Sequence, residues 1–184
     1  DLDDQIELRS DIEITDDFTP ISKFNGVFNG NGHTVSGLNG TFIKKVTSNA
    51  ILQDVTFKDV KLDGNSKGIF KENHGEIQSV TIKDITRTSL SEDQERDLGT
   101  CSSDISDTIS DTSTVYFNRD SEELIQNSIG CLVGVNLGQI DTCKVSGLDI
   151  EYVSPLEQEW AGIGVISGIS INGKVTDCVV DGNS

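Results

Sequence analysis

Residues Leu52–Val60 read LQDVTFKDV, and residues Ile77–Ile85 repeat the phrase as IQSVTIKDI. Further copies are IDTCKVSGL at Ile140–Leu148 and VTDCVVDG at Val175–Gly182, while HTVSGL at His33–Leu38 matches the later part of the phrase. Repetition at this spacing is typical of architectures in which each repeat is one structural unit stacked on its neighbours.

The repeated phrase has the alternation of a half-buried β-strand. Apolar residues such as Val55 and Phe57 alternate with Thr, Lys, Ser or Asp, so one face is apolar and the other polar. We expect the central apolar positions of the five copies to stack in one column, with about 4.8 Å between neighbours. These positions are Val35, Phe57, Ile82, Val145 and Val180.

This pattern predicts an all-β fold, a right-handed parallel β-helix (β-solenoid) of about five rungs. We expect residues 1–184 to form a single domain and a fragment of a longer protein, because the last phrase stops in mid-rung. The segment Arg87–Asn127 does not resemble the repeat, and it is predicted to be a large acidic insertion rich in Ser, Thr and Asp. Insertions in repeat proteins map to one face, which is often the binding face.

Glycine and asparagine precede several phrases at predicted corners. Gly30, Gly32, Gly75, Gly138 and Gly173 are expected where φ is positive or where stacked backbones leave no room for a Cβ atom. Asn73 and Asn136 each lie two residues before such a glycine. We expect these two side chains to form an inward hydrogen-bonded ladder that satisfies corner backbone groups.

The charge and the cysteines restrict the function. A net charge of −17 disfavours nucleic acid and anionic membranes as partners, and it suggests either adaptation to high salt or an ordinary acidic surface protein. No apolar run is long enough to cross a membrane. Cys143 and Cys178 share a repeat position and are expected to be buried free thiols, whereas Cys101 and Cys131 are a possible disulfide that would hold the insertion.

The segment Phe18–Leu38 carries a more specific pattern, FTPISKFNGVFNGNGHTVSGL, and GCLVGVNLGQIDTCKV follows at Gly130–Val145. Both resemble GLUG-motif repeat regions of bacterial and archaeal cell-surface, adhesin-like proteins. The resemblance implies an extracellular location and a role in cell adhesion, and it covers most of the chain outside the insertion.

The sequence contains no Ser/His/Asp order, phosphate-binding loop or metal-spaced histidine pair, so we predict that the chain is not an enzyme. Asp59 and Asp84 are expected to stack on adjacent rungs, where they could serve as a carboxylate pair or bind Ca²⁺, but solvated turn residues are the simpler interpretation. His33 is expected to be a satisfied core imidazole. No cofactor is predicted; Ca²⁺ remains possible, and Asp104–Asp111 (DISDTISD) is the segment closest to a calcium loop, although it has no loop glycine.

The preferred functional hypothesis is an extracellular structural or adhesive module of a larger surface protein that presents the insertion to a protein or glycan. One alternative is a carbohydrate-binding or carbohydrate-active β-helix domain that uses a carboxylate groove such as Asp54, Asp59 and Asp84; another is a viral or appendage fibre spacer. Trp160 is expected to cover apolar surface or to serve as a sugar-stacking platform. The candidate binding residues are Asp104, Asp107, Asp111, Tyr116 and Trp160.

Overall fold

The chain forms β-strands that pair in parallel. A computed structural model describes residues 4–15, 18–63, 66–87, 128–150 and 162–181. Within these ranges the regular elements are all strands, with no helix, and each recorded strand pairing is parallel. The expectation of an all-β fold with parallel strands is therefore confirmed at this level.

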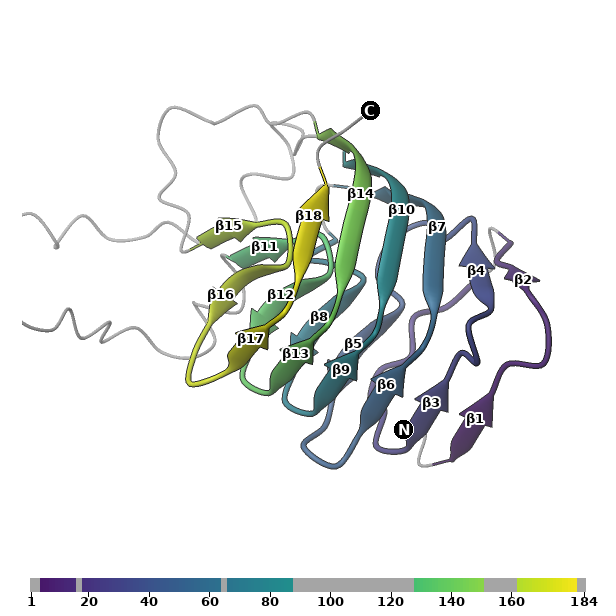
Figure 1. Cartoon of the computed structure of the whole chain (residues 1–184), viewed down its shortest axis with the longest axis horizontal. Helices are drawn as coiled ribbons and strands as arrows, with labels where there is room; N and C mark the ends of the chain where they lie inside the picture. Colours follow the sequence, from purple (N-terminus) through teal and green to yellow (C-terminus); the bar gives the residue numbers. More distant parts are fainter. Residues whose placement is uncertain (1–3, 16–17, 64–65, 88–127, 151–161, 182–184) are drawn as a thin grey trace, which may run out of the picture.

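Each sheet collects strands from successive passes of the chain (Figure 1). The first sheet contains, in spatial order, β1 (Gln5–Glu7), β3 (Val27–Asn29), β6 (Ile51–Gln53), β9 (Glu76–Gln78), β13 (Gln139–Asp141) and β17 (Lys174–Thr176). The second contains β2 (Ile12–Glu13), β4 (Thr34–Ser36), β7 (Thr56–Leu62), β10 (Thr81–Arg87), β14 (Lys144–Ile150) and β18 (Val179–Asp181). The third contains β5 (Ile43–Val46), β8 (Phe70–Asn73), β12 (Val133–Asn136) and β16 (Ser167–Ser170), and β11 (Ser128–Gly130) pairs separately with β15 (Gly162–Gly164).

The repeated phrase sets the register of the second sheet. The register partners, taken strand by strand, are Val35, Phe57, Ile82, Val145 and Val180. The first four are fully buried, whereas Val180 on the last strand is 45% exposed. Burying one such side chain contributes about 1.5–3 kcal/mol, so the column is a main source of stability and weakens at its C-terminal end.

Aromatic rings connect the three larger sheets through a shared core. The ring centroids of Phe57 (β7) and Phe70 (β8) lie 5.9 Å apart, and Phe57 also lies 5.2 Å from Phe42, in both cases edge to face. Phe42 in turn lies 5.9 Å from Phe28 of β3. Edge-to-face pairs at these distances are favourable beyond their burial, and they fix the sheets relative to one another.

Two rows of residues with left-handed backbone bend each pass of the chain at equivalent points. The first row precedes the strands of the second sheet and consists of Asp54, Ser79, Thr142 and Asp177, with φ between 50° and 53°. The second row consists of Gly37, which directly follows β4, and of Asp59, Asp84 and Gly147, which lie within β7, β10 and β14. Glycine and Asp tolerate this conformation better than most residues, which explains why the second row consists of these two types.

The boundaries of the segments predicted from the sequence differ little from those in the structure. The N-terminal segment contributes β1 and β2, which are the outermost strands of the first and second sheets. Arg87, the first residue of the predicted insertion, is the last residue of β10 and pairs in register with Leu62 and Ile150. The strand therefore extends one residue into the segment that sequence alone assigns to the insertion.

Candidate functional site

A polar groove of about 470 Å³ runs along one corner of the molecule, where strands of the third sheet lead into strands of the first. Its lining comes from four successive passes of the chain. The side chains that give the groove its polar character are Asn49, His74, Glu76, Gln139, Asn172 and Lys174. A groove that offers donors and acceptors of both charge signs can hold a polar ligand in an extended conformation.

Buried asparagines hold this corner in place. Asn73 donates a side-chain hydrogen bond to Asn136 at 2.9 Å, and Asn136 donates to the Ser170 hydroxyl at 3.2 Å. Each asparagine also accepts from the backbone N–H two residues later, that of Gly75 or of Gly138. Both asparagines are fully buried. The predicted asparagine ladder is confirmed, and it holds the backbone of Gly75 and Gly138, two residues that line the groove.

Close backbone stacking explains the corner glycines. A Cβ atom at Gly75 would lie 2.3 Å from the Thr47 carbonyl oxygen, and one at Gly138 would lie 2.1 Å from the Gly75 carbonyl oxygen. Real Cβ atoms do not approach so closely, so glycine is required at these positions. Gly32 instead has open space and a φ of +77°, so both of the predicted reasons for a corner glycine occur.

A small ionic network lies beside the groove. Glu72 of β8 lies 3.3 Å from the His74 ring and 3.5 Å from the Lys45 ammonium, and the Glu72 side chain is 14% exposed. These contacts orient His74, which lines the groove. The sequence pattern did not single out His74, because its contact with Glu72 depends on the path of the strand that carries both residues to the corner.

The carboxylates suggested for carbohydrate chemistry lie elsewhere. Asp59 and Asp84 line a smaller hollow of about 250 Å³ on the second sheet, and Asp54 is not among its lining residues. Asp59 is 59% exposed and lies 3.7 Å from the Lys58 ammonium, as expected of a solvated Lys–Asp pair. Asp84 folds over the adjacent pass, since a Cβ atom at Gly147 would lie 2.6 Å from its carboxylate.

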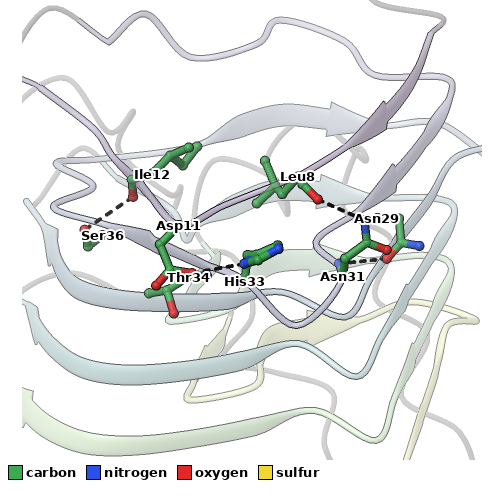
Figure 2. Close-up of polar contacts among 8 residues, drawn as sticks. All are labelled: Leu8, Asp11, Ile12, Asn29, Asn31, His33, Thr34 and Ser36. Atoms are coloured by element: carbon green, nitrogen blue, oxygen red, sulfur yellow. Dashed lines mark hydrogen bonds and ion pairs between the residues drawn. The ribbon is translucent and has the colours of Figure 1, made fainter.

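His33 is not a core imidazole. Its side chain is 34% exposed, and Nδ1 lies 3.3 Å from the Asp11 carboxylate (Figure 2). Asp11 also accepts the Thr34 N–H at 2.9 Å, and this bond is the main cause of its lowered pKa. The expectation was wrong because only the first pass of the chain lies over His33, and there Ser10 and Asp11 are exposed.

The cysteine predictions have two outcomes. Cys143 is a buried free thiol, as expected, and burial raises its pKa to about 12; Cys178 is a free thiol but is only partly buried. Cys131 is buried, and burial raises the pKa of its thiol. Cys101 lies outside the described residues, so the disulfide stays a prediction.

The predicted binding residues also lie outside the described part of the chain, namely Asp104, Asp107, Asp111, Tyr116 and Trp160. Among the residues that the structure describes, no three His, Cys, Asp or Glu side chains gather as a metal site requires. Nor does the described part contain a helix long and apolar enough to span a membrane.

One buried polar cluster was missed by sequence reasoning. Lys67 and Arg87 are each 8% exposed, and Arg87 donates to the carbonyl oxygens of Ser66 at 2.8 Å and Gly130 at 2.9 Å. Burial is the main cause that lowers the pKa of each, to about 8 for Lys67. The sequence does contain one indication of this cluster: Arg87 occupies a repeat position at which the neighbouring passes carry the apolar residues Leu62 and Ile150.

Comparisons of this chain with protein-family models, with curated proteins and with solved structures found no match.

Proposed function

We propose that this chain is an extracellular structural or adhesive module of a surface protein, built as a right-handed parallel β-helix of about five rungs. The observation that carries the proposal is the continuous register of the second sheet. Ile82 pairs with Val145 across the Arg87–Asn127 segment, as Phe57 pairs with Ile82 where there is no such segment. Right-handed connections are the rule between parallel strands of one sheet.

A stack that keeps its register on both sides of a long excursion is suited to presenting that excursion. The predicted role of Arg87–Asn127 is therefore partner binding, with a protein or a glycan on another surface as the partner. The resemblance of Phe18–Leu38 and Gly130–Val145 to GLUG-motif regions supports the cell-surface assignment. The charge of −17 supports a partner other than nucleic acid, and it is compatible with function in high salt.

Replacing residues 88–127 with a short Gly-Ser linker tests this proposal. The parent protein and the variant would be applied to a glycan array and to immobilised extracellular proteins, after thermal unfolding has shown that the variant folds. We expect binding by the parent and its loss in the variant. Release of reducing sugar from polysaccharides, abolished by Asp59→Asn or Asp84→Asn, would instead establish a carbohydrate-active enzyme and end the proposal.

The corner groove favours one further candidate, a carbohydrate-binding module. Its support is the polar lining drawn from four passes of the chain, within which Gln139 and Lys174 lie in register. In this case Gln139→Ala would weaken glycan binding while the linker variant retained it. Gln53→Ala, on the same sheet but outside the lining, is the matched control.

A further inference from the structure

The buried cluster of Lys67 and Arg87 contains donors without acceptors. The Lys67 Nζ and Arg87 Nε atoms are the two buried side-chain nitrogen or oxygen atoms, within the described residues, that have no hydrogen-bond partner. The two residues are adjacent through the backbone, because Arg87 donates to the carbonyl oxygens of Ser66 and Gly130, and the Gly130 N–H donates to the Lys67 carbonyl oxygen at 2.9 Å. Buried polar groups are nearly always satisfied, so a shared acceptor is the economical explanation.

The charges around the cluster are predominantly positive. The charges of Arg87 and Lys71 both act on Lys67 and disfavour its protonated form. One carboxylate, that of Asp63, acts on Arg87, and it accepts hydrogen bonds from the Ser66 N–H at 2.9 Å and the Ser66 hydroxyl at 2.7 Å. The Cys131 thiol is the remaining titratable neighbour of Arg87; it shares a side-chain hydrogen bond with the guanidinium, which still leaves Arg87 Nε without a partner. Such an excess of cations is unexpected in a chain of net charge −17.

A neutral acceptor does not compensate the positive charge of this cluster. A water molecule can accept hydrogen bonds from both nitrogens, but it leaves two like charges buried beside each other. An anion accepts the same hydrogen bonds and also compensates the charge. Because Lys67 is only 8% exposed, the acceptor must be compact.

We propose that Lys67 and Arg87 together bind a small inorganic anion, a halide such as chloride, beneath the point where β10 ends and β11 begins. The anion accepts from Lys67 Nζ and Arg87 Nε, while Arg87 Nη2 keeps its bonds to the carbonyl oxygens of Ser66 and Gly130. Through the guanidinium, the site thereby links Ser66 to Gly130 of β11. This inference is independent of the proposed adhesive role.

Thermal unfolding in different sodium salts at constant ionic strength tests the site. Chloride and bromide would be compared with gluconate, an anion too large for the cluster, so that general screening is equal in every sample. We expect the parent midpoint to rise by several degrees with halide concentration, as binding to the folded state requires. A midpoint equal in gluconate and halide would overturn the proposal.

Variants locate the effect. Lys67→Met keeps the length of the side chain but removes the charge, and it should abolish the halide response while raising the midpoint in gluconate. Lys144→Met, at a side chain 50% exposed on β14, should leave the response unchanged. A halide response that survives in Lys67→Met would exclude this site.

Bromide soaked into crystals of the parent protein gives a direct readout that does not depend on any variant. We expect an anomalous peak within hydrogen-bond distance of Lys67 Nζ and Arg87 Nε. An ordinary water peak there, with no anomalous signal, would refute the proposal.

Discussion

Replacing Asn136 with alanine tests the asparagine ladder beneath the corner groove. The Asn136 amide oxygen accepts from Asn73 at 2.9 Å and from the Gly138 N–H at 3.2 Å, and its nitrogen donates to the Ser170 hydroxyl at 3.2 Å and to the Lys174 carbonyl oxygen at 3.3 Å. A net contribution of about 0.5–1.5 kcal/mol per hydrogen bond, together with the penalty for buried groups left unsatisfied, predicts a loss of about 3 kcal/mol.

Urea unfolding followed by circular dichroism would measure this loss as a change in the free energy of unfolding. Asn49→Ala, at an exposed asparagine on the same corner, is the matched control, with an expected loss below about 0.5 kcal/mol. A double-mutant cycle with Asn73→Ala isolates the direct contact, for which a coupling energy of about 1 kcal/mol is expected.

The reasoning would be refuted if Asn136→Ala cost no more than Asn49→Ala. It would also fail if the cycle showed no coupling, because the two amides would then act independently of each other.

Four other predictions follow from the packing and the titrating groups. Ile82→Ala, at a fully buried position, should cost about 2–5 kcal/mol in urea unfolding, whereas Val180→Ala, at a half-exposed position, should cost below about 1 kcal/mol. Gly147→Ala should cost more than about 1–2 kcal/mol by the same measurement, because φ is +63° and the added Cβ atom would also lie 2.6 Å from the Asp84 carboxylate and 2.9 Å from the Asp84 backbone nitrogen. Since burial raises the pKa of Cys143 to about 12 from 9.0, its alkylation by iodoacetamide at pH 8 should be about 10³-fold slower than in urea, as mass spectrometry would record. Burial lowers the pKa of Lys67 from 10.5 to about 8, so in halide-free buffer the unfolded chain retains this proton to higher pH than the folded chain does. The free energy of unfolding should therefore rise by about 3 kcal/mol between pH 8 and 10.5 in the parent protein. Lys67→Met should not show this rise.

The register of the second sheet could be predicted from the sequence because each copy of the repeat aligns with the next. Each copy of the phrase carries an apolar residue at the position of Phe57, and parallel stacking of identical patterns brings those positions together. The asparagine ladder was equally accessible, since Asn73 and Asn136 precede corner glycines at the same spacing.

Other features depend on relations that no repeat encodes. The exposure of His33 depends on what the first pass of the chain places over it, and the Glu72–His74 contact depends on strand geometry. Left-handed backbone at Ser79 and Thr142 was also missed, because neither residue type favours it. Arg87 was assigned to the insertion because a charged residue interrupts the apolar pattern, although it continues the strand.

The pairing of Ile82 with Val145 has a consequence for protein engineering. Phe57 and Ile82 are separated by 25 positions and Ile82 and Val145 by 63, yet the register is the same. Because the entropy of closing a flexible loop grows only with the logarithm of its length, the longer connection costs about 0.8 kcal/mol more. A foreign peptide or a whole domain could therefore be grafted between β10 and β11 at little thermodynamic cost, provided that its two ends lie close together.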